Sequence, residues 1–295
     1  MDRSHGTACE YDRCLACGGT RLRLLHRIHG YAIGQCPRCL LAHTLNVRLD
    51  PALFYDHAYF VSPDAPKGYS DYLALAAAME RTNRARLRRL RRLVPTAQTL
   101  LDVGCGPGFF VKAATDAGLQ ACGLEVSEFA AHYGREQLRQ RIVTGPIDAE
   151  HLAGIGGGFD LITLWDAIEH LPSPDEALSL LAGRLEPGGA LTLSTGDIGS
   201  LAARASGPRW HLYNLPEHLW FFSVPSLQRL LRQAGLRVIG LQREVCWYTA
   251  WYLVERLLFS FGRRPPRVRA GAVLNRIPIP VTLLDIVTIS ARKAL

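Results

Sequence analysis

The fold class is decided by residues 98–108, which read Gln-Thr-Leu-Leu-Asp-Val-Gly-Cys-Gly-Pro-Gly. The apolar run before the glycines predicts a buried strand. Because Gly104, Gly106 and Gly108 lack a Cβ atom, the chain can turn sharply there and let a ligand lie against the main chain. Pro107 suits the first turn of a helix, which we expect over about 107–117. The free N–H groups of that helix would face an anionic group, so the stretch predicts a nucleotide-binding loop.

An acidic residue follows the loop at the spacing of a ribose-binding site. Glu125 ends a second apolar run 21 residues after Gly104, where it is placed to accept hydrogen bonds from both ribose hydroxyls. Phe109 stands where a dinucleotide-binding loop carries its third glycine, which argues against NAD and favours S-adenosylmethionine. A strand predicted over 159–164 should deliver two more residues to the ligand at its carboxyl end. The predicted cofactor-binding residues are Asp102, Gly104, Cys105, Gly106, Gly108, Glu125, Val126, Trp165 and Asp166.

With these motifs, residues 95–245 are similar to the class I S-adenosylmethionine-dependent methyltransferases. The resemblance implies an α/β, Rossmann-like sheet that is mostly parallel with an antiparallel last strand. It also implies that an acid such as Asp148 meets the adenine amino group. The remaining apolar runs predict helices over 128–139 and 226–234, and the last two strands over 236–244 and 285–291.

Length and composition describe a folded protein with room for a small extra module. The chain has 295 residues, of which 48% are hydrophobic and 20% charged, and its net charge is +8. We divide it into a module at 1–48, a tyrosine-rich connector with a basic helix at 49–94, and a methyltransferase domain at 95–295 that carries an insert at 247–280. The first 13 residues are polar and no apolar run reaches about 18 residues, so we expect a cytoplasmic protein.

Two cysteine pairs near the amino terminus predict a small zinc ribbon. Cys14 and Cys17 form one C-x-x-C pair, Cys36 and Cys39 form the other, and 18 residues separate them. Four thiolates close a tetrahedral shell around Zn²⁺, so such a site is structural. The alternative is two pairs of reduced core thiols. The pattern resembles a group of bacterial methyltransferases whose cysteine pairs precede a tyrosine-rich connector like residues 55–60 and 69–72 here, which implies a lid over the cofactor.

A basic helix precedes the glycine loop, and an aromatic insert follows the predicted strand at 236–244. Leu87, Leu90 and Leu93 form the apolar seam of the helix. Its arginines are Arg81, Arg84, Arg86, Arg88, Arg89, Arg91 and Arg92. They form either a solvated face or a surface for an anionic substrate, RNA or acidic lipid. The apolar run 247–261 and the arginines after it up to 267 either pack beside the active site or lie in the inner membrane interface.

A D-x-x-E-H pattern follows the strand predicted at 159–164. Asp166, Glu169 and His170 stand at i, i+3 and i+4, so on a helix they share one face. The pattern is similar to one in ubiquinone-pathway O-methyltransferases, and the resemblance implies a divalent metal on the corresponding residues. Two carboxylates and an imidazole would hold Mg²⁺ with several waters and orient a catechol-like substrate. The alternative is an exposed helix start whose histidine bonds to the next loop.

The segment 210–223 carries the candidate general base. It reads Trp-His-Leu-Tyr-Asn-Leu-Pro-Glu-His-Leu-Trp-Phe-Phe-Ser and resembles the substrate-side segment of the family. A histidine with a pKa near neutrality can take the proton of an acceptor hydroxyl during methyl transfer. We therefore expect His218 to be the base, with Glu217 or His211 as helpers and His170 as a further catalytic residue. A packed, hydrogen-bonded His218 without a chemical role is the alternative.

Three functions compete for this combination of motifs. The first is methyl transfer to an oxygen or carbon of a small sugar, quinone-like or lipid-linked intermediate. The second is rRNA or tRNA methylation, with the zinc ribbon and basic helix binding RNA. Residues 164–167 read Leu-Trp-Asp-Ala, without the Asn/Asp-Pro-Pro-aromatic motif of base-amino methyltransferases, which favours the first. The third is a non-catalytic cofactor-binding module at a membrane surface, which the intact loop and Glu125 disfavour.

Overall fold

The computed structural model describes residues 13–45, 47, 54–55, 60, 76–260, 273–274 and 277–293. They belong to two compact units. The first unit comprises Met1–Pro51, Ile147–Glu244 and Leu283–Leu295, and the second comprises Ala52–Pro146 and Val245–Thr282. Helices and strands alternate along the chain from β4 to α9, as in a Rossmann-like α/β protein.

The first unit contains strands β7, β8, β10 and β13, helices around them, and a second, smaller sheet. Its elements are β1 (Arg23–Ile28), β2 (Tyr31–Gln35), β3 (Ala42–Thr44), α6 (Ala149–Ile155), β7 (Phe159–Trp165), η2 (Ile168–His170), α7 (Pro174–Gly183), β8 (Leu185–Gly196), α8 (Leu201–Ser206), η3 (Gly207–Arg209), β9 (Trp220–Phe221), α9 (Val224–Gln233), β10 (Leu236–Arg243) and β13 (Ile286–Lys293).

The larger set of strands in this unit has the order β10-β13-β8-β7. Strands β7 and β8 are parallel, whereas β13 runs antiparallel to both β8 and β10. The predicted antiparallel end of the sheet is therefore confirmed. Leu161, Ile162 and Leu164 of β7 are fully buried, which is the continuous apolar pattern of a strand covered on both faces.

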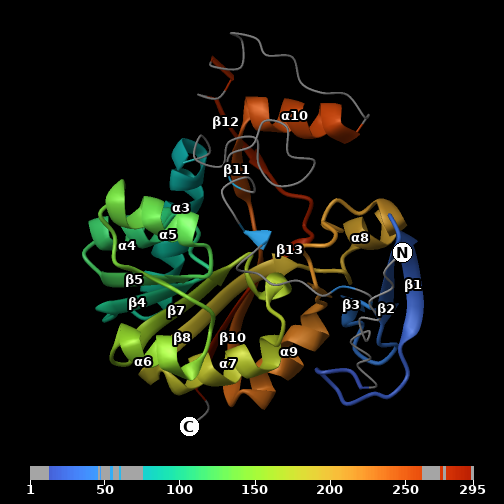
Figure 1. Ribbon diagram of the computed structural model, residues 1–295, viewed down its shortest axis with the longest axis horizontal. Helices are drawn as coiled ribbons and strands as arrows, with labels where there is room; N and C mark the ends of the chain where they lie inside the picture. Colours follow the sequence, from blue (N-terminus) through green and yellow to red (C-terminus); the bar gives the residue numbers. More distant parts are fainter. Residues whose placement is uncertain are drawn as a thin grey trace, which may run out of the picture. The chain divides into compact units, whose positions relative to one another are not determined.

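The smaller sheet has the order β1-β2-β3-β9, with each pair antiparallel. It joins the amino-terminal cysteine module, which supplies β1 to β3, to the segment predicted as substrate-side, which supplies β9. Figure 1 shows the blue strands β1–β3 beside α8. Ile33 of β2, Ala203 of α8 and Phe221 of β9 share one hydrophobic core with Trp210. The module and segment 198–221 thus bury apolar surface against each other.

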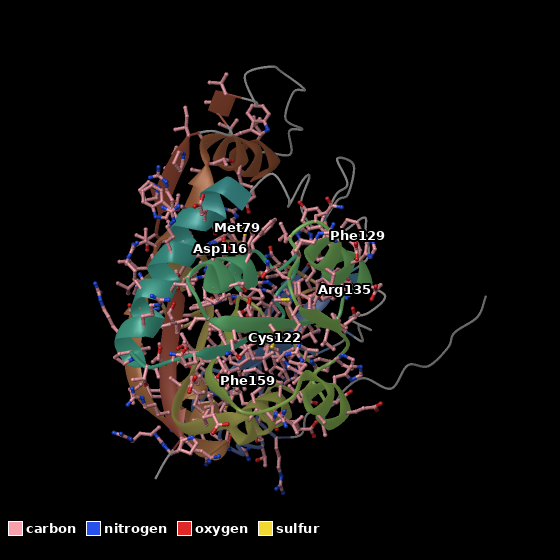
Figure 2. All side chains as sticks on the ribbon, turned by 90° about the vertical axis from the view of Figure 1, so that its left-hand side faces the viewer. Met79, Asp116, Cys122, Phe129, Arg135 and Phe159 are labelled. Atoms are coloured by element: carbon pink, nitrogen blue, oxygen red, sulfur yellow. The ribbon has the colours of Figure 1, made fainter. Side chains whose placement is uncertain are left out.

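The second unit carries the glycine loop. Its elements are α3 (Ala76–Leu93), β4 (Thr99–Val103), α4 (Phe109–Asp116), β5 (Gln120–Glu125), α5 (Glu128–Glu136), β6 (Ile142–Thr144), β11 (Cys246–Thr249), α10 (Ala250–Ser260) and β12 (Pro278–Val281). Strands β4, β5 and β6 lie in that order and are parallel. In Figure 2, Cys122 is labelled on β5, Met79 on α3 and Phe129 on α5. The predicted strand-loop-helix order is confirmed.

The basic helix forms as predicted, with one correction. Leu87 and Leu90 of α3 are buried and Leu93 is partly buried, which agrees with the predicted apolar seam. Arg86, however, is only 5% exposed, so it does not belong to a solvated arginine face. The insert after β10 forms a two-stranded sheet of β11 and β12 and the helix α10. Most of the tyrosine-rich connector, including residues 69–72, and the arginines at 263–267 lie outside the described residues.

No helix among the described residues combines the length and the apolar character needed to cross a bilayer.

A substitution at Gly134 can test the packing of α5 against the glycine loop. A Cβ atom at Gly134 of α5 would contact the Ile142 side chain and lie 2.8 Å from the Pro107 carbonyl oxygen. Alanine is normally better than glycine in a helix by about 1 kcal/mol. We expect Gly134→Ala instead to reduce the free energy of unfolding by about 1–3 kcal/mol, because the backbone of Pro107 would have to move.

The matched control is Gly154→Ala in α6, where a Cβ atom meets nothing within 4 Å. It should raise the free energy of unfolding by up to about 1 kcal/mol. Urea unfolding of both variants measures the two effects. Equal stabilisation by both substitutions would contradict the assigned contact between α5 and the loop.

Candidate functional site

The glycine loop lies between the carboxyl end of β4 and the start of α4. Gly104, Gly106 and Gly108 have φ angles of 68°, 54° and 84°, in the left-handed region that favours glycine. Gly108 is the N-cap residue of α4, so the helix begins with its free N–H groups at the loop. Asp102 is buried at the end of β4. The loop therefore has the backbone shape that the spacing of its glycines predicts.

Glu125 at the end of β5 fixes the loop from the neighbouring strand. One carboxylate oxygen accepts a hydrogen bond of 2.7 Å from the N–H of Gly106, and the other accepts one of 2.9 Å from the N–H of Ser127. Burial raises the pKa of Glu125, while these backbone hydrogen bonds oppose the rise. Each oxygen retains a second lone pair, so the carboxylate can still accept the two ribose hydroxyls.

The other loop residues have packing roles that the sequence did not reveal. Cys105 lies against Gly123 of β5, where a Cβ atom would collide with its sulfur. Burial raises the pKa of Cys105, so it is a small packing thiol and no nucleophile. A Cβ atom at Gly108 would lie 2.6 Å from Cδ1 of Ile142. Gly123 and Ile142 thus pack against the loop. No sequence motif indicates this role, which is visible only from their contacts in the structure.

The carboxyl end of β7 is in the first unit and carries Trp165 and Asp166, as predicted. Asp166 has a φ of 52°, which is unusual for a residue with a side chain. Its N–H donates to the carbonyl and hydroxyl oxygens of Ser194, and its carboxylate accepts the Ser194 hydroxyl at 2.9 Å. The prediction that Asp166, Glu169 and His170 share a helix face is wrong. Only a single 3-10 turn, η2, forms, and Asp166 lies before it in the left-handed conformation.

Instead, η2 places Glu169 and His170 against His218. One potential ligand atom from each of these three side chains lies within 4.8 Å of the others. The two imidazole rings meet edge to face, with 4.7 Å between their centroids. The D-x-x-E-H pattern could not reveal the third member, because His218 comes from a loop 48 residues later in the chain than His170.

The backbone around this cluster determines which ring nitrogens carry protons. Nδ1 of His170 lies 2.9 Å from the carbonyl oxygen of Glu217, so this nitrogen must donate and Nε2 carries the lone pair. The ring of His218 likewise hydrogen-bonds to the backbone of Leu212. In each ring the nitrogen that meets a backbone carbonyl carries the proton, so the other nitrogen carries the lone pair.

Burial determines the charges of the cluster. It lowers the pKa of His170 to about 4 and that of His218 well below its ordinary value, so both rings are neutral at pH 7. Burial, with the nearby charge of Asp166, raises the pKa of Glu169 to about 8. The expectation of a near-neutral pKa for His218 is therefore corrected, because desolvation disfavours its charged form.

The remaining predicted residues lie apart from one another, and all but Val126 belong to the first unit. Glu217 is buried, and its Oε2 has no hydrogen-bond partner among the residues that the structure describes; the same holds for Oε2 of Glu169. His211 pairs with the buried Asp285, at 3.5 Å between Nδ1 and Oδ2. Asp148 is the N-cap residue of α6 and accepts the N–H of His151. Val126 follows Glu125 in the second unit.

The four amino-terminal cysteines form a second candidate metal site. One sulfur from each lies within 4.8 Å of the others, with Cys14 and Cys39 3.4 Å apart and Cys17 and Cys36 3.5 Å apart. Cys14, Cys36 and Cys39 are buried, and all four are free thiols. The donor set of four sulfurs and its closed, buried setting fit a structural zinc ion.

Comparisons with known proteins agree with this geometry. A family model described as a methyltransferase domain matches residues 75–241, which is more than half of the chain. The chain belongs to this methyltransferase family. The match covers the glycine loop, Glu125 and the cluster of Glu169, His170 and His218. The protein is thus a methyltransferase whose fold supports S-adenosylmethionine as the methyl donor.

Curated relatives of this methyltransferase include ubiquinone biosynthesis O-methyltransferases. The protein of that name from Thiobacillus denitrificans is 30% identical over 165 residues, which are 52% of this chain and 71% of that protein. The one from Cereibacter sphaeroides is 31% identical over 161 residues, 52% of this chain and 65% of that protein. The match to each relative thus leaves roughly a third of its length uncovered.

Solved structures show the same fold at low sequence identity. An S-adenosylmethionine-dependent methyltransferase from Clostridium acetobutylicum is 10% identical, with a TM-score of 0.50 over 74% of this chain and 92% of that one. The YcgJ protein from Bacillus subtilis is 16% identical, with a TM-score of 0.50 over 73% of this chain and 99% of that one. These likenesses concern the methyltransferase fold alone.

Replacing Glu125 tests the ribose site of this methyltransferase. Glu125→Gln keeps the size of the side chain but removes its charge and one of its acceptor oxygens. We expect S-adenosylmethionine to bind about 10- to 100-fold more weakly, because charge-assisted hydrogen bonds to both hydroxyls would be lost. Isothermal titration calorimetry measures the dissociation constant. The control is Glu128→Gln in the exposed first turn of α5, which should bind normally; unchanged binding by Glu125→Gln would refute the assignment.

Proposed function

We propose that this methyltransferase moves a methyl group from S-adenosylmethionine to a hydroxyl oxygen of a small, quinone-like intermediate. The observation that carries the proposal is the buried cluster of Glu169, His170 and His218, which offers two neutral imidazoles and one carboxyl group whose raised pKa keeps it protonated at pH 7 until a cation displaces the proton. The names of its relatives, ubiquinone biosynthesis O-methyltransferases, agree with an acceptor of this class. A sugar or lipid-linked hydroxyl fits the same chemistry less closely, because a catechol offers two adjacent oxygens.

The reaction is an in-line displacement at the sulfonium methyl carbon. The bond from sulfur to methyl breaks as the bond from the acceptor oxygen to methyl forms, and the sulfonium becomes a neutral thioether. The hydroxyl proton must leave the acceptor oxygen. Alignment and exclusion of water supply most of the rate enhancement, and proton removal supplies the rest. Glu169, His170 and His218 are the groups of the first unit that we assign to orienting the acceptor. The proton passes to solvent water from a cation-bound hydroxyl, or to His218 if that residue acts as the general base instead of as a ligand.

We assign a divalent cation to this cluster and not to the predicted set of Asp166, Glu169 and His170. The Asp166 carboxylate accepts the Ser194 hydroxyl, whereas Glu169, His170 and His218 each bring one potential ligand atom within 4.8 Å of the others. Two imidazoles and one carboxylate suit Mn²⁺, Co²⁺ or Zn²⁺ better than Mg²⁺, which prefers oxygen ligands. A bound cation would lower the pKa of the acceptor hydroxyl. In this proposal His218 is a ligand of the cation. The competing hypothesis is that His218 acts as the general base.

The decisive experiment measures methyl transfer to 3,4-dihydroxybenzoate and to a catechol with a short polyprenyl chain, using isotopically labelled S-adenosylmethionine. We expect Glu169→Gln and His218→Ala to reduce kcat roughly 10²- to 10⁴-fold and to leave the dissociation constant of S-adenosylmethionine unchanged. Glu176→Gln, at an exposed position of α7, is the control. Full turnover by Glu169→Gln would exclude the cation site, and failure to methylate either catechol would exclude the acceptor class.

We further propose that the four cysteines hold one structural Zn²⁺. The closeness of the four sulfurs and their burial support this assignment. The two knuckles also have the necessary turns: the N–H of Gly18 donates to the carbonyl of Cys14, and the N–H of Leu40 donates to the carbonyl of Cys36. Reduced core thiols alone would need no such paired turns.

For a partner, we propose an anionic lipid surface on the second unit. Arg81, Arg84 and Arg88 are exposed along α3. The Arg81 guanidinium lies 5.1 Å from the ring centroid of Trp247, and the backbone N–H of Trp247 donates to the Thr82 hydroxyl. Trp247, the first residue of the insert, therefore contacts the basic helix α3. Several aliphatic side chains of this insert are more than a third exposed, namely Val245, Val254, Val273 and Ile277. Exposed aliphatic side chains beside arginines favour anionic lipid over RNA.

Vesicle sedimentation tests this surface. We expect binding to vesicles that contain phosphatidylglycerol and none to pure phosphatidylcholine. Arg84→Glu with Arg88→Glu should weaken binding at least about 30-fold, because each arginine near an anionic surface contributes about 1 kcal/mol. Arg232→Glu with Arg237→Glu, two exposed arginines of the first unit, is the matched control. Equal binding by both double variants, or binding of tRNA but not of vesicles, would overturn the proposal.

A further inference from the structure

The loop 215–223, called the acceptor loop from here on, carries Glu217 and His218 and is held from two sides. Leu215 and Pro216 begin it, and Ser223, the N-cap residue of α9, ends it. A loop that must hold a buried histidine in one position needs anchors for its backbone, because a shift of about 1 Å is enough to impair alignment in a catalytic site. The anchors can be named residue by residue.

On one side, the anchors come from η2 and the residue after it. The N–H of Leu219 donates to the carbonyl of Glu169 at 2.9 Å. Nδ1 of His170 donates to the carbonyl of Glu217 at 2.9 Å, and the indole N–H of Trp220 donates to the carbonyl of Leu171 at 2.9 Å. These bonds bring the acceptor loop to Glu169 and His170.

On the other side, the anchors come from β3 of the cysteine module. The N–H of Thr44 donates to the carbonyl of Leu219 at 3.0 Å, and the Thr44 hydroxyl donates to the carbonyl of His218 at 3.1 Å. Strand β3 continues this contact as an antiparallel pair with β9, where His43 lies opposite Trp220 and the two rings are 5.1 Å apart. The Thr44 hydroxyl is therefore the side-chain group through which β3 holds the backbone of His218.

The cysteine cluster leads directly into these contacts. Two residues separate Cys39, a member of the cluster, from the start of β3, and the Cys39 carbonyl accepts the hydroxyl of Ser223. The N–H of Cys36 donates to the carbonyl of Leu41 at 2.8 Å. The second cysteine knuckle thus fixes the entry to β3 and also the end of the acceptor loop. A module of this size has too little core of its own to keep such a knuckle without a metal.

We propose that the cysteine module is a positioning device for the acceptor loop, in which metal at the four cysteines fixes β3 and Thr44 of β3 fixes His218. The inference rests on the proposed function only for the reaction that His218 serves. Thr44 and His43 are positioning residues, since both act through the acceptor loop. Loss of the metal should loosen residues 217–222 and leave the glycine loop in the second unit unchanged.

Hydrogen-deuterium exchange followed by mass spectrometry tests the coupling without any acceptor. The full chain is compared as the zinc-loaded protein and after zinc removal with a chelator, and zinc content is measured by atomic spectroscopy. We expect amides of 217–222 to exchange at least about tenfold faster in the zinc-free protein, with residues 99–108 unaffected. Equal exchange of 217–222 in the loaded and zinc-free protein would overturn the proposal.

A single-residue variant covers the case in which the zinc-free protein unfolds. Thr44→Val keeps the shape of the side chain and removes the hydroxyl that bonds to His218. It should keep its zinc and speed exchange of 217–222 about tenfold, because one backbone anchor is lost. Thr44→Ser, which retains the hydroxyl, should restore protection. The matched control is Thr192→Val, because the buried Thr192 bonds to Ser290 between β8 and β13 and not to the loop.

Kinetics separate failure of this inference from failure of the proposed function. With a catechol acceptor, Thr44→Val should raise KM for the acceptor about fivefold or more and leave KM for S-adenosylmethionine unchanged. If the wild type methylates no catechol, the exchange measurement still decides the coupling. If the wild type is active and Thr44→Val matches Thr192→Val in exchange and in both KM values, the module does not position the loop.

Discussion

The cost of burying Glu169, His170 and His218 is the constraint on which the candidate site of the first unit depends. A buried carboxyl or imidazole without partners would be strongly destabilising, so each ring donates to a backbone carbonyl, those of Glu217 and Leu212. Of this cluster, Oε2 of Glu169 has no hydrogen-bond partner among the residues that the structure describes. A buried polar atom without a hydrogen-bond partner, beside groups whose hydrogen bonds are made, is a feature that a ligand site requires.

The same principle organises the glycine loop of the second unit. Glu125 is buried, and the N–H groups of Gly106 and Ser127 hold its two oxygens. The carboxylate therefore supports the glycine loop before any ligand arrives, so the cost of arranging the site is met during folding. Ser127 also caps α5 through its hydroxyl, which connects the same corner to the following helix.

The amino-terminal module has a larger role than its sequence indicates. From the cysteine spacing alone it is a self-contained zinc ribbon. In the structure, β3 pairs with β9, and Ile33 of the module shares a core with Trp210 and Phe221. A small module that completes a sheet with a distant segment stabilises that segment, because neither could bury its apolar face alone.

The sequence by itself determined the strand-loop-helix order, the place of Glu125 at the end of the neighbouring strand, the cysteine cluster and the antiparallel end of the sheet. These features depend on local spacing and on apolar runs, which a chain carries in its own order. Only the tertiary structure decided that the Asp166 carboxylate accepts the Ser194 hydroxyl and that His218, not Asp166, lies with Glu169 and His170. It also decided the low pKa of His218 and the burial of Arg86, because desolvation depends on neighbours brought from elsewhere in the chain. Spacing predicts which residues can meet along one element, whereas contacts between distant segments exist only once the chain has packed.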